Sequence, residues 1–426
     1  MKNCLKLNIC VYVISALLLC WPFPGVASAQ AEVGVDDRTI YLGSSNAQSG
    51  PAQELGQGMS RGLNLYFNKV NQQGGVHGRQ IKLIQMDDQY DVKRVIENTQ
   101  ELVAHRNVFA LVGYVGTPTA RAIIPKISRE NIPFLAPYTG AKFLRSPPLP
   151  MVFNTRASYM DEMELIVHEL VDGRKFKRIG LFMQNDSYGL SGESALKEAL
   201  KKRGLEIVQT GTYERNTEDV DAAFQELRKA SPDAVIMVGT YKACAVFLQK
   251  AREAQMRSVF YNISFVGTGS LIANAKAAAE DVYITQVFPD PLTSDLPVIV
   301  QYRADMIAAG LADKMDYPSL EGYIDAVLLI KALEATGPNL TRARFVETLN
   351  HFKADLGGLD FQFTPDHHQA SDRVYLTQIS QGKAKPVTVN TDHKEPDHKD
   401  FDHKDSKQSD SGQKESAKEN SVDSKP

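Results

Sequence analysis

Short apolar runs alternate along this chain with longer segments whose apolar residues recur every three or four positions. The first unit predicts a strand at 39–43, a helix at 59–70 and a strand at 81–86. The glycine-rich run 74–78 between them ends the helix and reverses the chain. A strand, a helix and a second strand in this order predict a parallel sheet with helices on its faces.

A long segment separates the first expected strand from the first expected helix, and it contains the turn sequence Ser49-Gly50-Pro51. Loops at the carboxyl ends of parallel strands are where open α/β sheets bind their ligands. We therefore expect residues 46–55 to line a ligand site.

The same alternation continues in two series, which the proline-rich segment 146–150 separates. Further helices are expected at 91–104, 117–130, 158–171, 191–202, 220–229, 243–255, 296–309, 319–336 and 342–351. Further strands are expected at 108–112, 132–136, 152–153, 178–183, 206–210, 234–238, 258–263, 282–287 and 373–379. Two series predict an α/β fold of two doubly wound lobes.

The helices expected after residue 296 and the last expected strand have to pack on elements that precede them in the sequence. If the helices join the first lobe and the strand returns to the second, the chain crosses between the lobes more than once and forms a hinge. The expected division is a leader at 1–29, lobe 1 at 31–153 and 286–362, lobe 2 at 154–285 and 363–387, and a tail at 388–426.

The first 29 residues have the features of a secretory signal peptide. A basic start at Lys2 and Lys6 precedes the apolar run 9–19, and the small residues 27–29 form a cleavage site. We expect cleavage after Ala29 and export to the periplasm. No later apolar run is long enough to span a bilayer.

Three of the four cysteines lie in this leader. Lipidation of Cys20 is disfavoured, because Leu19 occupies the preceding position, where that processing needs a small residue. After cleavage only Cys244 remains, which excludes an internal disulfide and a cysteine-based metal site.

The composition changes from residue 390 onward, where Phe401 is the only aromatic residue. This tail cannot bury apolar surface, so we expect it to be disordered. It repeats Asp-His-Lys three times, which makes His393, His398 and His403 weak candidates for binding Zn or Ni. The lysine in each repeat opposes a cation, and a solvated low-complexity tail is the favoured interpretation.

Composition and motifs exclude several classes of function. The 426 residues are 43% hydrophobic and 23% charged, which is typical of soluble globular proteins. The formal net charge of −3 gives no electrostatic attraction to nucleic acid. The chain has no G-x-S-x-G, H-E-x-x-H, C-x-x-C or G-x-x-x-x-G-K-[ST] motif, so we expect neither an enzyme nor a cofactor. Gly56, Gly58 and Gly62 are one residue off a dinucleotide fingerprint, and we interpret them as sites of close helix packing.

The turn and the glycines of the opening stretch form a specific pattern. Its positions are Ser49-Gly50-Pro51, Gly56, Gly62, Asn71, Gly74-Gly75-Val76, Gly78 and Asp87-Asp88. This pattern resembles the amino-terminal signature of type I periplasmic binding proteins, the solute receptors of ABC importers, in the leucine/isoleucine/valine- and amide-binding branch. Further similarity lies at 136–140, 185–189 and 233–235, and the resemblance extends over residues 38–380.

The resemblance implies two lobes, joined by a hinge of three crossing strands, that close on a small polar solute. It implies an amino-acid-like, amide or carboxylate solute, a permease in the inner membrane as partner and a monomeric receptor. The same fold can instead feed a membrane sensor kinase or chemoreceptor, and this is the main alternative. A metal-binding surface protein acting through the histidine tail is a third.

The resemblance also places ligand-binding residues at Thr117, Tyr138, Thr139, Gly140, Tyr188, Thr240 and Ser264. Some of these positions have a second interpretation. Thr117, with Pro118 after it, fits the N-cap of its helix, a role that is compatible with ligand contact. Tyr188 before Gly189 fits a turn, although a tyrosine in a strand-end loop is typical of a cleft.

Two positions depart from the family pattern. Where amino-acid receptors of this branch have an acidic residue for the ligand ammonium, this chain has Ser264, which puts a plain branched-chain amino acid in doubt. The first-lobe disulfide of the family is replaced by Tyr90 and Gly116. Four charged residues near the expected cleft are candidates for reading a ligand charge: Arg156, Asp186, Lys242 and Glu321.

Overall fold

The computed structural model describes residues 32–389 of the chain. The expected leader and nearly all of the expected tail, with its three candidate metal-binding histidines, lie outside this range. Within residues 32–389, no helix is both long and apolar enough to cross a membrane. Cys244, the one free cysteine of this range, is buried.

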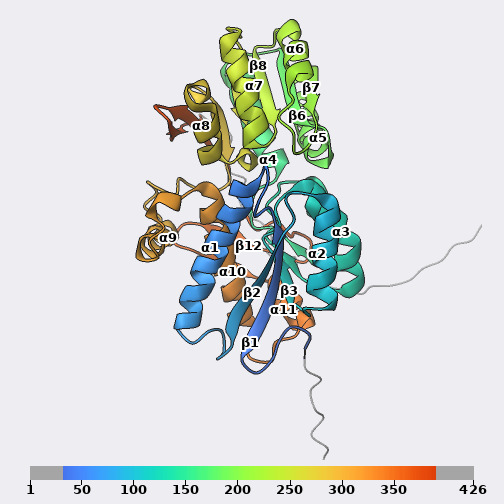
Figure 1. The fold of residues 1–426 in the computed structure, drawn as a ribbon, viewed down its shortest axis with the longest axis vertical. Coiled ribbons are helices and arrows are strands. Elements are labelled where there is room, and N and C mark those ends of the chain that lie inside the picture. Colours follow the sequence, from blue (N-terminus) through green and yellow to red (C-terminus); the bar gives the residue numbers. More distant parts are fainter. Residues whose placement is uncertain (1–31, 390–426) are drawn as a thin grey trace, which may run out of the picture. The chain divides into compact units, whose positions relative to one another are not determined.

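The first sheet is parallel throughout, with the strand order β2-β1-β3-β4-β5. Its strands are β1 (Thr39–Asn46), β2 (Gln80–Asp87), β3 (Ala110–Val112), β4 (Phe134–Leu135) and β5 (Val152–Phe153). Its connecting helices are α1 (Gln53–Gln72), α2 (Val92–Ala104) and α3 (Thr117–Glu130). In Figure 1, α1 lies on one side of this sheet and α2 and α3 lie on the other, which is the doubly wound arrangement expected from the sequence.

The second sheet has seven strands in the order β14-β13-β10-β9-β8-β6-β7. Its strands are β6 (Ile179–Gln184), β7 (Ile207–Tyr213), β8 (Ala234–Val238), β9 (Val259–Asn262), β10 (Tyr283–Gln286), β13 (Tyr375–Ser380) and β14 (Lys383–Val387). Its helices are α4 (Tyr159–Val167), α5 (Ser187–Lys201), α6 (Asp221–Ala230), α7 (Tyr241–Glu253) and α8 (Thr268–Ala275). Only the last two strands run antiparallel to their neighbours.

The late part of the chain adds helices to the first lobe, as the sequence predicted. These elements are α9 (Pro297–Ala308), α10 (Tyr317–Thr336), α11 (Arg342–Asn350) and the two-stranded sheet β11 (Lys353–Asp355) with β12 (Asp360–Gln362). Shorter helical turns are η1 (Lys142–Leu144), η2 (His168–Gly173), η3 (Ser264–Val266), η4 (Lys276–Ala279) and η5 (Ala312–Lys314).

Glycines allow α1 and α10 to pack backbone against backbone. A Cβ atom added at Gly62 of α1 would lie 2.1 Å from the carbonyl oxygen of Ser319, and one at Gly322 would lie 2.2 Å from that of Met59. Both distances are far below van der Waals contact, so a side chain at either position would push the helices apart. The close-packing interpretation of Gly62 is thus confirmed.

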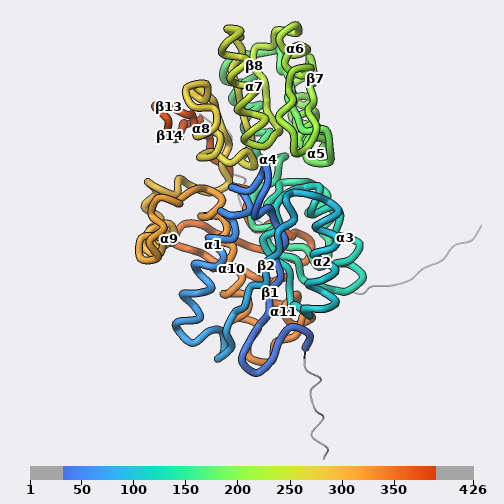
Figure 2. The backbone as a smooth tube through the Cα atoms, in the orientation of Figure 1, coloured from blue at the N-terminus to red at the C-terminus, as the bar shows by residue number. Residues whose placement is uncertain are grey.

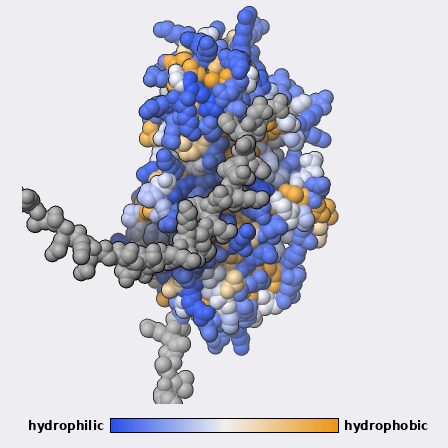
Figure 3. Space-filling view, turned by 180° about the vertical axis from the view of Figure 1, so that it is seen from behind, coloured by the Kyte–Doolittle hydropathy of each residue, from blue (hydrophilic) through white to orange (hydrophobic). Residues whose placement is uncertain are grey.

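The chain passes between the two lobes three times, and these passages can be followed along the tube of Figure 2. They lie after β5, after β10 and between β12 and β13. This confirms the three-strand hinge, while the residue boundaries assigned to the lobes stay a prediction. The face visible in Figure 3 is mainly hydrophilic, with separate small apolar areas, as is usual for a protein surface.

The first loop is shorter than the sequence predicted. Strand β1 extends to Asn46, which pairs with Asp87 of β2, and helix α1 begins at Gln53 rather than at residue 59. The loop is held on β2 because the Ser49 hydroxyl donates a hydrogen bond of 2.6 Å to the Asp87 carboxylate. The loop expected between residues 43 and 59 is therefore shorter at both ends, and the expectation that residues 46–55 line a ligand site stays a prediction.

Candidate ligand-binding cleft

Three hydroxyl groups meet at the start of α3. The Thr117 Oγ1 atom lies 2.6 Å from Thr139 Oγ1, and the Tyr159 hydroxyl lies 3.2 Å from Thr139 Oγ1 and 3.5 Å from Thr117 Oγ1. All three side chains are buried. Thr117 and Thr139 were expected in the site, whereas Tyr159, the first residue of α4, was missed.

The predicted N-cap at Thr117 was wrong. Helix α3 begins at Thr117 itself, and Gly116 is the N-cap, with a φ of 108° that a residue with a side chain rarely adopts. The Thr117 hydroxyl is therefore not engaged in capping and instead points to Thr139. Gly140 also has a steric role, because a Cβ atom there would lie 2.5 Å from the Tyr159 ring.

Tyrosines from both lobes pack around one phenylalanine, Phe265 of η3. Its ring centroid lies 4.5 Å from that of Tyr188, 5.5 Å from that of Tyr138 and 6.2 Å from that of Tyr90. Tyr90 and Tyr138 belong to the first lobe, whereas Tyr188 and Phe265 belong to the second. Phe265 was missed from the sequence, although it directly follows the predicted site residue Ser264.

Tyr188 lies at the centre of this aromatic cluster. Its ring centroid is 5.8 Å from that of Tyr159, so the aromatic cluster adjoins the three hydroxyls at the start of α3. The Tyr188 hydroxyl is buried and has no hydrogen-bond partner among residues 32–389. Burial raises the pKa of Tyr188 well above its usual range, so the hydroxyl stays a neutral donor.

Arg156 lies on the first crossing between the lobes, directly before α4, and its side chain is fully buried. The guanidinium carbon lies 4.4 Å from the centroid of the Tyr138 ring, and Nη2 donates a hydrogen bond to the Ser264 hydroxyl. Nη1 lies 3.5 Å from a carboxylate oxygen of Glu321 on α10. Neither Nε nor Nη1 has a hydrogen-bond partner within the described range.

Ser264 connects this cation to a buried acid. The Glu162 carboxylate accepts hydrogen bonds from the Ser264 amide at 2.7 Å and from the Ser264 hydroxyl at 3.0 Å, and a third from Thr285 Oγ1. A carboxylate from α4 thus contacts Ser264, the residue at the position where the sequence lacks an acid. Because the position of Glu162 on a helix face resembles that of any core-facing residue, nothing in its spacing identified it.

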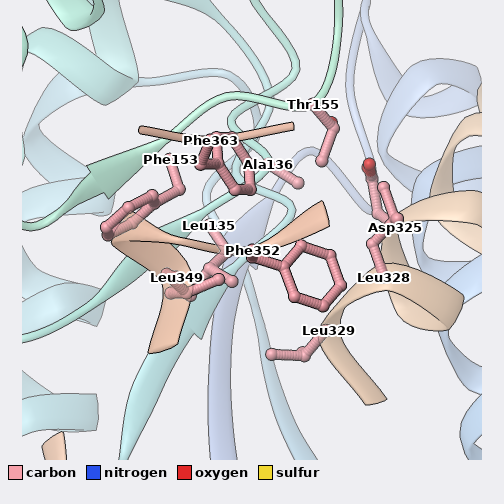
Figure 4. Close-up of a pocket in the computed structure, with 10 residues that line it drawn as sticks. All are labelled: Leu135, Ala136, Phe153, Thr155, Asp325, Leu328, Leu329, Leu349, Phe352 and Phe363. Atoms are coloured by element: carbon pink, nitrogen blue, oxygen red, sulfur yellow. The ribbon is translucent and has the colours of Figure 1, made fainter. Parts of the chain in front are cut away.

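Burial affects the other acids around Arg156 as well. It raises the pKa of Glu321 to about 7, although the charge of Arg156 opposes this shift. It raises the pKa of Asp325, one turn further along α10, well above its usual range. Asp325 and Thr155 line a cavity of about 10 Å³, whose other walls are apolar side chains of the first lobe (Figure 4).

Thr240 and Asp186 lie beside the aromatic cluster rather than in it. The Thr240 amide donates a 2.9 Å hydrogen bond to the Tyr213 hydroxyl, which in turn donates to Gln184. Asp186 caps α5, where it accepts a 2.8 Å hydrogen bond from the Tyr188 amide. Lys242 lies in the first turn of α7.

Tyr90 and Gly116, which replace the two cysteines of the family's first-lobe disulfide, are in contact. A Cβ atom at Gly116 would lie 2.2 Å from the Tyr90 ring, so the glycine makes room for that ring. Among residues 32–389, no cluster of three or more His, Cys, Asp or Glu side chains is placed to hold a metal ion. What the site offers is hydroxyls, aromatic rings and the buried guanidinium of Arg156, while the buried guanidinium of Arg145 donates to the backbone carbonyls of Thr139 and Arg156.

Comparison with known proteins covers most of the chain. The model of the periplasmic binding protein family matches residues 39–384. A Leu/Ile/Val-binding protein homolog 7 from Brucella abortus (strain 2308) is 26% identical over 387 residues, covering 86% of this chain and 95% of the relative.

Two solved structures are similar as well. A possible leucine/isoleucine/valine-binding protein from Rhodopirellula baltica SH 1 has a TM-score of 0.79 and 32% identity, covering 84% of this chain and 98% of that one. A fatty acid ABC transporter substrate-binding protein from Thermomonospora curvata has a TM-score of 0.77 and 25% identity, covering 84% of this chain and 93% of that one.

Proposed function

Because the chain belongs to the periplasmic binding protein family, we propose that it is the extracytoplasmic solute-binding receptor of an ABC importer. The observation that carries this proposal is that Tyr138 and Tyr188, which belong to different lobes, both pack against the ring of Phe265. A solute held between such residues would join the lobes across the hinge.

The proposed solute is small and polar, of the amino-acid-like, amide or carboxylate class. The buried hydroxyls of Thr117, Thr139 and Tyr188 and the guanidinium of Arg156 supply hydrogen-bond donors for it. Relatives that are Leu/Ile/Val-binding protein homologues and a fatty acid ABC transporter substrate-binding protein support this range. The predicted ligand-binding set, Thr117, Tyr138, Thr139, Gly140, Tyr188, Thr240 and Ser264, stays a proposal.

Closure of the hinge is the proposed mechanism of capture. A solute that contacts both lobes binds the closed form better than the open form, and this difference in affinity shifts the population to the closed form. Closure also removes water from the site, which strengthens every polar contact in it. No chemical step is involved, and we propose that the protein is not an enzyme.

The remaining features of an importer receptor follow from the same assignment. We propose export to the periplasm with cleavage near Ala29, a permease of the inner membrane as partner, and a monomeric receptor. Detergent-solubilised permease should then bind the ligand-loaded protein better than the ligand-free protein. Binding to a sensor kinase in its place would favour the alternative role.

Mass spectrometry of solute released from the purified mature protein, followed by a thermal-shift screen, tests the proposed function. A solute at one hundred times its dissociation constant should stabilise the fold by about 2.7 kcal/mol. The proposal fails if no amino acid, amide, fatty acid or aromatic acid changes the melting temperature.

A further inference from the structure

We propose that the cleft selects monocarboxylates that have an aromatic or branched apolar body and no α-ammonium group, and that Arg156 binds their carboxylate. This inference rests on the proposed solute-binding function and narrows it to one chemical class. The evidence for it is which of the buried charged groups around the aromatic cluster already have partners and which do not.

Arg156 is the buried cation that contacts this cluster. It lies against Tyr138 of the first lobe and Ser264 of the second, so a group bound to it touches both lobes. Its Nε and Nη1 atoms are buried without a hydrogen-bond partner among residues 32–389. Each of these N–H groups can donate a charge-assisted hydrogen bond to a carboxylate oxygen, and such bonds are roughly twice as strong as bonds between neutral groups.

The contact between Nη1 and its present partner is longer than the best pairing of opposite charges. The Glu321 oxygen lies 3.5 Å from Nη1, which is longer than a charge-assisted hydrogen bond of 2.7–2.9 Å. Burial also raises the pKa of Glu321 to about 7, so its charged form is not strongly held. A ligand carboxylate can therefore take over the pairing with Arg156 while Glu321 takes up a proton.

Two of the acids beside the aromatic cluster are already engaged by hydrogen bonds. Glu162 accepts three hydrogen bonds, two of them from Ser264. Asp186 accepts hydrogen bonds from the Tyr188 amide and from Gln184. Glu321 and Asp325 remain, but burial raises the pKa of both carboxyl groups, so their charged forms, which alone can pair with an ammonium, are disfavoured. A ligand ammonium would then stay unpaired beside Arg156, and an unpaired buried charge costs several kcal/mol.

The aromatic side chains beside Arg156 suit an apolar ligand body. The rings of Tyr138, Tyr159, Tyr188 and Phe265 form a continuous aromatic surface. The Tyr188 hydroxyl, which has no partner in the described range, is the remaining free donor of this surface. Aromatic walls with a few placed polar groups are the usual construction of a small-molecule site.

Matched pairs of acids that differ only in the amino group test the class. Calorimetry should compare leucine with 4-methylpentanoate and phenylalanine with 3-phenylpropanoate, and 4-methylpentanamide serves as the uncharged control. We expect the deaminated acid to bind at least tenfold more tightly than the amino acid in one pair, and the amide not to bind. Tighter binding of the amino acid in both pairs would overturn the inference and leave the receptor function standing.

Three variants test the role of Arg156. Arg156→Gln should weaken binding of the deaminated acid by about 100-fold, the order expected for loss of a buried charge pair. Since this variant leaves Glu321 without its partner, Arg156→Gln/Glu321→Gln should show the same loss in a fold without that unpaired acid. Glu321→Gln alone should strengthen binding, because the ligand carboxylate then has no competing carboxylate at Arg156, and weaker binding would contradict the exchange of partners.

Two results separate the possible failures. Unchanged affinity in Arg156→Gln/Glu321→Gln would remove Arg156 from the site, whatever the ligand class. If no compound binds the wild-type protein, including any solute released from it by heat, the receptor function itself fails.

Discussion

Asp88 is a buried carboxyl group directly after β2. It accepts hydrogen bonds of 2.9 Å from the Ser45 hydroxyl and from the Tyr90 amide, next to the aromatic cluster. Burial nevertheless raises its pKa to about 7, because two hydrogen bonds do not replace the solvation that an ionised carboxylate loses. The folded chain therefore holds a proton on Asp88 that the unfolded chain releases at a lower pH.

This pKa shift predicts a pH-dependent stability. Since the pKa of Asp88 is higher in the folded state, its effect on the free energy of unfolding is favourable at low pH and is lost as pH rises from about 4 to about 7. Asp88→Asn should remove up to about 4 kcal/mol of that decline. Urea unfolding at pH 4.5 and pH 8 measures the difference.

The exposed acid Asp313, whose pKa its neighbour Lys314 lowers, is the control. Asp313→Asn should leave the decline of stability between the two pH values unchanged. An equal decline in wild type and Asp88→Asn would contradict the assignment of the proton to Asp88.

Ser264 gives a second prediction at the scale of one residue. Its hydroxyl donates to Glu162 and accepts from Arg156, so Ser264→Ala removes one hydrogen bond from each buried charge. Stability should fall by about 1–3 kcal/mol, as is usual when a buried polar group loses a partner. Thermal unfolding measures this, and Ser270→Ala at a partly exposed position of α8 should have little effect.

At the scale of elements, the contact of α1 with α10 fixes the shape of the first lobe. The two helices approach through glycine backbones rather than through interlocked side chains. Such a contact does not tolerate larger residues at these glycines, because there is no space even for a methyl group.

Gly62→Ala should therefore destabilise the fold, although alanine is the better helix former. We expect a loss of about 1–3 kcal/mol from overpacking against Ser319. Gly269→Ala in α8 is the matched control, because nothing lies within 4 Å of the added Cβ atom there. That variant should be slightly more stable, and a Gly62→Ala protein as stable as the control would refute the packing argument. Denaturant titration measures both.

The helices and strands of both lobes could largely be predicted from the sequence, because the apolar periodicity of each one reflects the face that it buries. Tertiary contacts decided the ends of these elements. Asn46 continues β1 since it pairs with Asp87, and the glycine at 116 takes the cap position that was assigned to Thr117.

The residues of the site were predictable to a different degree. Thr117, Thr139 and Tyr188 were found through the resemblance to a family. Phe265 and Glu162 were not, because their roles arise from contacts across more than 70 positions of sequence, which no local pattern records. The helix α8 and the edge strand β14 were missed for a different reason, since they are only eight and five residues long and offer little periodicity.

At the scale of the whole molecule, Phe265 connects the lobes. Its ring contacts Tyr90 and Tyr138 of the first lobe, so the aromatic cluster stabilises the contact between the lobes even without a solute. Phe265→Ala should shift the ligand-free protein toward the open form and increase its radius of gyration in small-angle X-ray scattering. Added solute should reverse the increase, at a concentration at least tenfold higher than wild type needs.

Phe143→Ala provides the comparison, because that ring packs under Arg121 within the first lobe. It should leave the radius of gyration unchanged. Identical scattering of Phe265→Ala and wild type would show that the cluster does not hold the lobes together.

The buried cysteine has a practical consequence. Burial raises the pKa of the Cys244 thiol far above neutrality, so this group is both hidden and unreactive at physiological pH. A cysteine introduced at the rim of the cleft would then be the one thiol of residues 32–389 that a maleimide dye can modify. The fluorescence of such a dye would change as the lobes close. The labelled receptor would then report the concentration of its solute without any further reagent.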